Sequence, residues 1–293
     1  MTKNVILPNP EKLAKLKEKI SEDGADKIHV LSDFDRTLTT AFVDGKSMPS
    51  IISILRDGNY LTPDYAPKAH ALYNEYHPIE IDPDISFEEK KKAMHEWWMK
   101  AFDLLTKSGF TRDDLEKVVE SGKIRFRKGA LEFIDLLYAH NVPLIIMSSA
   151  GLGEAISMLF KKEGRLYENV YIISNSFEWD KNGNVIGIKQ PVIHALNKDE
   201  TAIQDYPVFE IIKNRKNVVL LGDSLGDIGM ITGFDYDNLI KIGFLNEEVE
   251  KNMGEYQKNY DIVILNDSDM NFVNKLFKDL INPVLQFDIC FTK

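Results

Sequence analysis

The stretch that decides the fold is Lys27-Ile-His-Val-Leu-Ser-Asp33-Phe-Asp35-Arg-Thr37, a short apolar run that ends in carboxylates. Similar runs recur along the chain, and most are rich in β-branched residues, which is typical of buried strands. They lie at Val142–Ser148, Asn169–Ser174, Asn217–Gly222, Leu239–Gly243 and Asp261–Leu265. Helical patterns, such as those of Gly129–His140 and Gly153–Lys162, separate several of them. Strands that alternate with helices predict an α/β fold with a parallel sheet.

Residues of about 43–125 interrupt this alternation and contain no convincing strand. Ser86-Phe-Glu-Glu89 matches a capping box that opens a helix, and Thr111-Arg-Asp-Asp114 is a second helix start. An apolar stripe at helical spacing follows the first of these, made of Met94, Trp97, Trp98, Ala101 and Leu105. We therefore expect an α/β core of residues 1–42 and 126–293, and a helical cap of residues 43–125 inserted after the first strand.

Two further segments have clear local patterns. Asn182-Gly183 stands between apolar flanks within Phe177–Lys189, which predicts a β-hairpin. Leu13, Leu16 and Ile20 fall at helical spacing, which predicts a helix docked on the surface.

Composition narrows the class of protein. Of 293 residues, 44% are hydrophobic and 28% are charged, as in ordinary globular proteins. The net charge of −10 argues against a protein that grips a nucleic acid polymer through a basic face. No apolar run approaches the roughly 18 residues of a membrane span, and Met1–Ile20 lacks the apolar region of a signal peptide. A lone cysteine, Cys290, excludes a disulfide scaffold, so we expect a cytoplasmic protein. We also expect a monomer.

Four segments at the ends of predicted strands carry polar groups. They are Asp33-Phe-Asp35-Arg-Thr37, Ser148-Ser149-Ala150-Gly151, the isolated Lys198, and Gly222-Asp223-Ser-Leu-Gly-Asp227. Each alone is more often a turn or a helix cap, but parallel strands gather their carboxyl ends at one edge of a sheet. Acids gathered there repel one another unless a cation lies among them. Oxygen-only ligands favour a hard ion such as Mg²⁺.

These residue types suit phosphoryl transfer. Asp33 can act as a nucleophile that forms an aspartyl-phosphate, and Asp35 can protonate the leaving oxygen and then deprotonate the attacking water. Ser149 and the backbone N–H groups after it, at a helix start, offer neutral donors to phosphate. Lys198 supplies a positive point charge for the transferring phosphoryl group.

DFDRTLT, SSAG, the isolated lysine and GDSLGD resemble the four motifs of the haloacid dehalogenase (HAD) superfamily of phosphatases. Longer stretches between about Asp33 and Asn274 resemble cytosolic 5′-nucleotidase III, the pyrimidine 5′-nucleotidase family. They are IDPDISFEEKKKAMHEWW (Ile81–Trp98), IIMSSAGLGE (Ile145–Glu154), SNSFEWDKNGNVIG (Ser174–Gly187), HALNKDE (His194–Glu200), LLGDSLGDIGM (Leu220–Met230) and IKIGFLN (Ile240–Asn246). The resemblance implies a HAD-like Rossmannoid sheet with a helical cap. It also implies a Mg²⁺-dependent hydrolase of nucleoside 5′-monophosphates that prefers pyrimidines such as CMP and UMP.

The resemblance also implies roles for the acids at the strand ends. Asp33 would be the nucleophile and Asp35 the acid and base. The metal ligands would be Asp33, the backbone carbonyl of Asp35 and Asp223, with Asp227 supporting the metal shell. Arg36 departs from the family pattern, in which this position is commonly apolar.

Substrate contacts follow from the same resemblance. Ser149, Ala150 and Lys198 would hold the phosphate. Glu96 resembles the family's base-recognising glutamate, and Ser121 is matched to a second substrate contact. Helical periodicity alone makes Glu96 a solvated acid, because it lies opposite the apolar stripe of its helix. The resemblance of the surrounding segment favours the base contact instead.

Other conspicuous side chains receive structural interpretations. We interpret Trp97 and Trp98 as cap core rather than as surfaces that stack on a base. His95 and His194 have no partner at metal-ligand spacing and are interpreted as structural. The Asp199-Glu200 pair is interpreted as solvated.

Three alternatives remain open on the sequence: a nucleotidase specific for 7-methylguanosine monophosphate, another capped HAD phosphatase acting on phosphoserine or a sugar phosphate, and a non-catalytic binding protein on the same fold. Phosphate transfer to an acceptor nucleoside is open as well.

Overall fold

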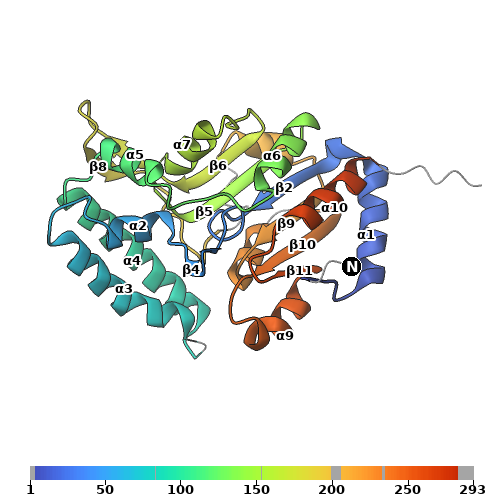
Figure 1. The fold of residues 1–293 in the computed structure, drawn as a ribbon, viewed down its shortest axis with the longest axis horizontal. Coiled ribbons are helices and arrows are strands. Elements are labelled where there is room, and N and C mark those ends of the chain that lie inside the picture. The colour runs from blue at the N-terminus through green and yellow to red at the C-terminus, as the bar shows by residue number, and fades with distance from the viewer. Residues whose placement is uncertain (1–3, 83, 153, 199–205, 233–234, 283–293) are drawn as a thin grey trace, which may run out of the picture.

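A seven-stranded sheet lies at the centre of the computed structural model, which describes residues 4–82, 84–152, 154–198, 206–232 and 235–282 (Figure 1). In spatial order its strands are β1 (Val5–Ile6), β11 (Ile262–Leu265), β10 (Asn238–Leu245), β9 (Asn217–Gly222), β2 (Ile28–Ser32), β5 (Leu144–Leu152) and β6 (Val170–Asn175). All neighbours pair in parallel except β1, which runs antiparallel to β11 at one edge. The predicted parallel α/β sheet is confirmed, with β1 as an unpredicted addition.

Helices cover both faces of the sheet, which explains why its central strands are continuous apolar runs. The helices of the core are α1 (Pro10–Asp23), α6 (Ala130–Ala139), α7 (Ala155–Lys162), α8 (Val208–Ile212), α9 (Val249–Asn259) and α10 (Asn271–Ile281). Val30 packs in the cluster with α1, α6, α7 and α10, whereas its neighbour Leu31 packs with α8 and α9. Successive strand side chains point to opposite faces, so β2 contributes to two separate apolar layers.

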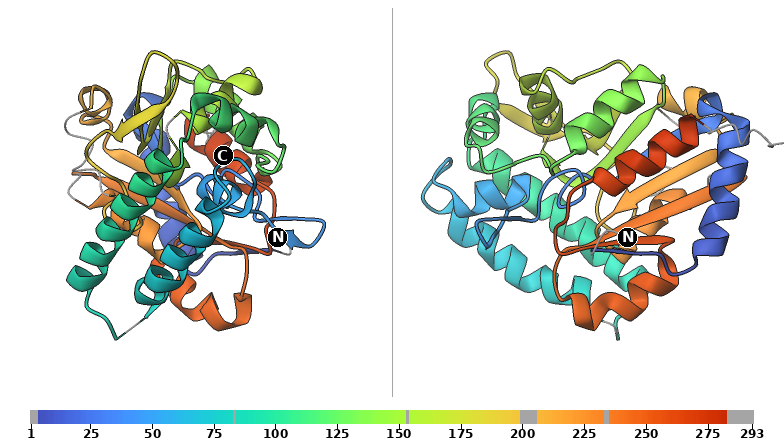
Figure 2. Two further views of the ribbon diagram at one scale, coloured as in Figure 1. Left: turned by 90° about the vertical axis from the view of Figure 1, so that its left-hand side faces the viewer. Right: turned by 45° about the vertical axis from the view of Figure 1, so that its right-hand side comes forward.

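A group of helices lies between β2 and β5 in the chain and beside the sheet in space (Figures 1 and 2). These cap helices are α2 (Ile51–Asp57), α3 (Tyr65–Ile81), α4 (Phe87–Lys107) and α5 (Arg112–Glu120). Both predicted helix starts are confirmed, since Ser86 and Thr111 each form a capping box with the acid three residues later.

One prediction about this region was wrong, because it does contain strand. β3 (Phe42–Val43) and β4 (Lys46–Ser47) form a short antiparallel pair. The turn between them has positive φ at Asp44 and Gly45, which suits a tight hairpin. Two residues per strand are too few for alternation to be visible in the sequence.

The predicted hairpin is confirmed as β7 (Phe177–Trp179) and β8 (Val185–Ile188). It packs against the cap, since the ring of Phe177 lies 5.5 Å from that of Phe102 and 5.3 Å from that of Phe110. Its turn also contacts the start of α5, where the N–H of Arg112 donates to the carbonyl of Gly183 at 2.9 Å.

The chain leaves the core for the cap helices and returns to it at adjacent points. We call residues 38–42 the outgoing linker and residues 124–127 the returning linker. Thr39 forms a β-bridge with Phe126, and the N–H of Thr40 donates to the carbonyl of Arg125 at 3.0 Å. The two linkers therefore run side by side. Within the part of the chain that the structure describes, no helix has the length and apolar character needed to cross a membrane.

Candidate active site

The carboxyl ends of three neighbouring strands carry the predicted acids and the predicted serine. Asp33 follows β2, Asp223 follows β9 on one side of it, and Ser149 lies near the end of β5 on the other. Carboxylate oxygens of Asp33, Asp223 and Asp227 all come within 4.8 Å of one another. The structure thus gathers these three predicted acids, and we call them the carboxylate cluster.

Lys198 reaches the same cluster from a distant part of the chain. Its Nζ forms an ion pair with Oδ1 of Asp33 and lies 3.3 Å from Oδ1 of Asp227. The lysine side chain is only 6% exposed, so salt and solvent screen these contacts much less than they would at the surface. The structure therefore brings the predicted nucleophile and the predicted phosphate-binding cation together.

Asp227 holds the turn that carries Asp223. Its Oδ2 accepts hydrogen bonds from the N–H of Asp223 at 3.1 Å and from the N–H and hydroxyl of Ser224 at 3.0 and 2.9 Å. Gly222 precedes this turn, and a Cβ there would lie 2.5 Å from that of Asp227, so only glycine fits. One oxygen of Asp227 is thus committed to the turn, and the other faces Lys198.

Burial raises the pKa values of Asp33, Asp35 and Asp223. Burial raises the pKa of Asp33 to about 6, with Lys198 opposing the shift and Asp227 adding to it. Burial and then the charge of Asp33 raise the pKa of Asp35 to about 7. Burial and the neighbouring acids also raise the pKa of Asp223 well above its ordinary value. Burial by itself lowers the pKa of Lys198, but the charges of Asp33 and Asp227 outweigh it, and the net shift is upward.

The carboxylate cluster fits a hard divalent cation. Three carboxylates offer oxygen donors close enough to share one ion, and oxygen-only sets select Mg²⁺ or similar metals. Burial first, and then the neighbouring negative charges, raise the pKa values of Asp33 and Asp223, and a bound cation would favour their charged forms. The side chain of Asp35 is half-buried and does not belong to this set, which is consistent with a backbone role in metal binding.

A buried asparagine aligns the predicted phosphate-binding residues. The side-chain amide of Asn175 donates to the carbonyls of Ser149 and Ile193, both at 2.9 Å, and accepts from the N–H of Ile193 at 2.8 Å. It thereby joins the end of β5, where Ser149 and Ala150 lie, to the segment that leads to Lys198. Sequence analysis did not single out Asn175, because an asparagine at a strand end has no local signature of such a role.

A cavity of about 220 Å³ lies between the cap helices and the core. Ser149 and Ala195 line it from the core, whereas Tyr73, Trp97 and Trp98 line it from the cap. Trp97 and Trp98 are half-buried and line this cavity, and Trp98 also packs against the hydrophobic core, as its assignment to the cap core predicts. Their faces border an open space because the apolar stripe of α4 meets the core across this cavity.

Two glutamates of the cap differ in their relation to this cavity. Glu96 is 59% exposed, pairs with Nζ of Lys100 at 2.8 Å, and is not among the lining residues. Glu80 does line the cavity, and its Oε2 lies 3.2 Å from Nδ1 of His77. Sequence analysis missed Glu80, because α3 has no strong apolar stripe to mark which of its faces meets the core. The base contact of Glu96 stays a prediction.

The remaining predicted residues lie apart from the cavity. Ser121 is exposed at the end of α5, where its hydroxyl donates to the carbonyl of Val118 at 2.6 Å. The buried ring of His194 lies 6.3 Å from that of His95. Burial lowers the pKa of His194 to about 4. These contacts agree with the structural interpretation of both histidines. Asp199-Glu200 lies outside the described residues.

Arg36 connects two parts of the molecule. Its Nη1 pairs with Oε1 of Glu247 at 2.5 Å, and its Nη2 donates to the hydroxyl of Ser47 at 2.6 Å. The residue has a positive φ of 58°, which turns the chain sharply after Asp35. The departure from the family pattern therefore links β4 to the loop after β10.

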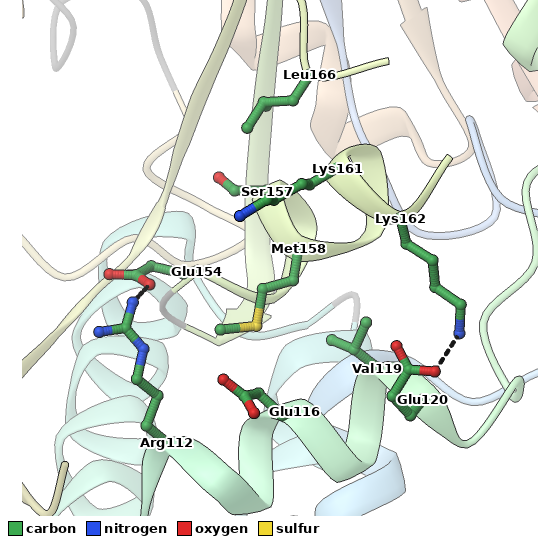
Figure 3. Close-up of a pocket in the computed structure, with 10 residues that line it drawn as sticks. All are labelled: Arg112, Glu116, Val119, Glu120, Glu154, Ser157, Met158, Lys161, Lys162 and Leu166. Atoms are coloured by element: carbon green, nitrogen blue, oxygen red, sulfur yellow. Dashed lines mark hydrogen bonds and ion pairs between the residues drawn. The ribbon is translucent and has the colours of Figure 1, made fainter. Parts of the chain in front are cut away.

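A larger and more open groove, of about 780 Å³, lies elsewhere between α5 and α7 (Figure 3). Figure 3 shows ion pairs reaching across it, between Arg112 and Glu154 and between Lys162 and Glu120. None of the predicted site residues that the structure describes lines this groove. The carboxylate cluster and the smaller cavity are therefore the candidate active site.

Solved structures define the class of protein. A HAD family hydrolase from Salmonella enterica serovar Typhi matches with a TM-score of 0.55 at 17% identity, covering 94% of this chain and 82% of that one. A phosphoserine phosphatase matches with a TM-score of 0.51 at 18% identity, covering 85% and 97%. At these identities the likeness shows the fold alone: the protein has the fold of the HAD phosphatases.

Sequence relatives define the family. The pyrimidine 5′-nucleotidase (UMPH-1) family matches residues 36–281. The 7-methylguanosine phosphate-specific 5′-nucleotidase A of Xenopus laevis is 36% identical over 97% of this chain and 95% of its own length. The human 7-methylguanosine phosphate-specific 5′-nucleotidase is 33% identical over 99% and 96%. A solved structure of cytosolic 5′-nucleotidase IIIB bound to cytidine has a TM-score of 0.88 at 29% identity, covering 96% of this chain and 94% of that one.

The chain therefore belongs to the pyrimidine 5′-nucleotidase (UMPH-1) family, as the resemblance predicted, and is a nucleotidase of the HAD superfamily.

Proposed function

We propose that this protein is a Mg²⁺-dependent phosphatase that hydrolyses nucleoside 5′-monophosphates to a nucleoside and phosphate. The observation that carries the proposal is the buried ion pair of Asp33 and Lys198 at the carboxyl end of β2. An aromatic-lined cavity, bordered by Ser149, lies between this region and the cap helices. A phosphate held at the cluster leaves the nucleoside to extend into that cavity.

The reaction we propose has two displacements at phosphorus. A carboxylate oxygen of Asp33 attacks, the Oδ–P bond forms, the bond from phosphorus to the 5′ oxygen breaks, and Asp35 gives that oxygen a proton. Asp35 then takes a proton from water, which attacks phosphorus and releases Asp33. The pKa of about 7 for Asp35 suits a group that must give and take a proton near neutral pH. Lys198 and the hydroxyl of Ser149 hold the phosphoryl oxygens, with backbone N–H groups at Ala150.

Asp33, Asp223 and the carbonyl of Asp35 would hold the metal, with Asp227 fixing the turn behind them. Bound there, Mg²⁺ supplies positive charge that offsets the repulsion between the acids and the phosphate.

Two substrate classes compete for the cavity under the cap. The family description and the cytidine complex of the IIIB structure support a pyrimidine nucleotide, which we favour. Relatives named for 7-methylguanosine phosphate support the second candidate, and a cationic base would also stack well on Trp97 or Trp98.

The test measures phosphate released from CMP, UMP, 7-methylguanosine monophosphate, AMP and GMP, beside p-nitrophenyl phosphate. Activity should vanish with EDTA, return with Mg²⁺, and return poorly with Ca²⁺, whose looser coordination misplaces the phosphate. Full turnover by metal-free protein would contradict the site we propose. Turnover of p-nitrophenyl phosphate without turnover of any nucleotide would leave a phosphatase but not a nucleotidase.

We also propose that the enzyme works in the cytoplasm as a monomer. A Caenorhabditis elegans relative, 35% identical, is named putative cytosolic 5′-nucleotidase 3. Light scattering should give a mass near 33.5 kDa. A mass of twice that value would contradict the monomer.

A further inference from the structure

Arg127 ends the returning linker, and its side chain is buried with every donor matched. A guanidinium has five N–H groups and accepts nothing. Its Nε donates to the carbonyl of Thr37 at 2.8 Å. Its Nη1 donates to the carbonyl of Ser268 at 2.9 Å and to Oδ1 of Asp267 at 2.8 Å. Its Nη2 donates to the carbonyl of Arg36 and, at 3.1 Å, to Oδ1 of Asn246. The residue is 2% exposed. Five donors therefore meet five acceptors away from water.

Two of those acceptors fix the backbone just after Asp35. The carbonyl of Arg36 accepts from Arg127 and also from the side-chain amide of Asn246 at 3.0 Å. The next carbonyl, of Thr37, accepts from the same guanidinium. Rotation of the loop at this turn would break these hydrogen bonds, so they restrain the backbone that directly follows Asp35.

Asp267, the charged partner of Arg127, holds the outgoing linker. Its Oδ1 accepts from the N–H of Ala41 at 2.8 Å, and its Oδ2 accepts from the N–H of Phe42 at 2.9 Å and from the hydroxyl of Thr40 at 2.5 Å. Arg127 belongs to the returning linker. One ion pair thus joins the loop that carries Asp35 to both connections with the cap helices.

Stability alone does not account for this arrangement. For the two charges alone, removal from water costs about as much as their attraction returns, so the ion pair by itself adds little stability. An apolar pair could not, however, fix three carbonyl directions and two linkers at once. Reaction rates are sensitive to such geometry, because a misplacement of about 1 Å can cost roughly 100-fold.

We propose, on the basis of the phosphatase function above, that Arg127 is a positioning residue. Together with Asp267 it holds Asp35 and the two cap linkers in the geometry that the phosphoryl transfer requires. Arg127 acts through the backbone and not by contact with the substrate. The variants should therefore lose turnover rate more than substrate affinity.

The test compares Arg127→Lys and Asp267→Asn with the wild type. Lysine keeps the charge but donates from a single point, and asparagine keeps the shape but loses acceptors. Arg165→Lys is the matched control, because Arg165 makes a two-pronged ion pair with Asp135 of α6, and neither residue belongs to the linkers. Each protein is assayed for kcat and KM with p-nitrophenyl phosphate and with the best nucleotide, and circular dichroism checks that it is folded at the assay temperature.

Both variants should lose roughly 10- to 100-fold in kcat on both substrates while the nucleotide KM changes by less than about threefold. The control should keep its kcat within about twofold. A folded Arg127→Lys protein with an unchanged kcat would overturn the proposal, as would an equal loss in Arg165→Lys.

Two other results remain informative. If Arg127→Lys fails to fold, Asp267→Asn decides, and if neither folds the residues are structural and the proposal is wrong. If the wild type cleaves p-nitrophenyl phosphate but no nucleotide, the nucleotidase function fails, whereas the loss of kcat on p-nitrophenyl phosphate still tests the positioning role.

Discussion

The carboxylate cluster and the cavity under the cap differ in how firmly their polar groups are held. In the cluster, Asp33, Lys198 and Asp227 are buried and contact one another, and backbone N–H groups fix the turn. In the cavity, half-buried aromatic side chains face open space, and the predicted base reader Glu96 is exposed. Under the proposed function, the reaction takes place among closely held groups, while the surface that meets the nucleoside is less constrained.

The strongest test of this division is Asp33→Asn. An amide cannot attack phosphorus, so turnover should fall by several orders of magnitude, on nucleotides and on p-nitrophenyl phosphate alike. The substitution also removes one charge from a crowded cluster, and since the pKa of Asp33 is raised, the metal-free variant should melt at a higher temperature than the wild type. A variant that keeps more than about a tenth of the wild-type rate would remove Asp33 from the reaction.

Lys198→Ala comes next in expected size. Loss of the ammonium should cut kcat by roughly 10²–10³-fold, comparable to the loss of one preorganised transition-state donor. The matched control is Lys213→Ala, which removes an ammonium that is paired with Glu210 three residues before it. Steady-state rates of both variants on p-nitrophenyl phosphate decide the matter, and equal rates would refute the role of Lys198.

The cavity is tested by a pair of identical substitutions in the cap. Glu80→Gln should raise the KM of the preferred nucleotide roughly tenfold if one charge-assisted hydrogen bond to the base is lost. Glu96→Gln should change it little, since that carboxylate already pairs with Lys100. Turnover of p-nitrophenyl phosphate, which has no base, should be unaffected in both. The reverse result would support Glu96, whose base contact is still a prediction, and would place the base outside the cavity.

The smallest expected effect concerns the burial of His29 in β2, the strand that precedes Asp33. Burial lowers the pKa of His29 in β2 to about 4 from 6.5. The unfolded chain then binds more protons than the folded one between those values, so His29 destabilises the fold as pH falls through that window. Relative to His29→Gln, the wild type should lose about 2 kcal/mol of unfolding free energy between pH 7.5 and 5, measured in urea with EDTA. Parallel pH curves for the two proteins would mean that water reaches this strand.

Much of the carboxylate cluster could be predicted because its signals are local. A short apolar run followed by an acid marks a strand end, and the geometry of parallel sheets brings such ends together. Asp33 and Asp223 were found in this way, and the same runs predicted the order of alternating elements. Lys198 was expected at a strand end too, but it lies in a loop beyond β8. Strands β1, β3 and β4 were not predicted, because each has two residues and shows no alternation of apolar and polar side chains.

The cavity could not be predicted because it is made by packing between distant segments. The stripe of α4 is visible in the sequence, but whether Trp97 faces the core or an opening depends on where α3 and Ser149 lie. Arg127 is a similar case. Nothing near it in the sequence shows that its acceptors would come from three separate segments of the chain.

The side-by-side linkers have a consequence for how such a protein can change. Because Thr39 pairs with Phe126, the stretch between them begins and ends at one place on the core, as a single long loop does. Loop length adds little to the cost of closing a chain, so the stretch can be shortened, lengthened or replaced without moving a strand of the sheet. Replacement of the cap helices could then change the selectivity that we propose for them, while the carboxylate cluster keeps its structure.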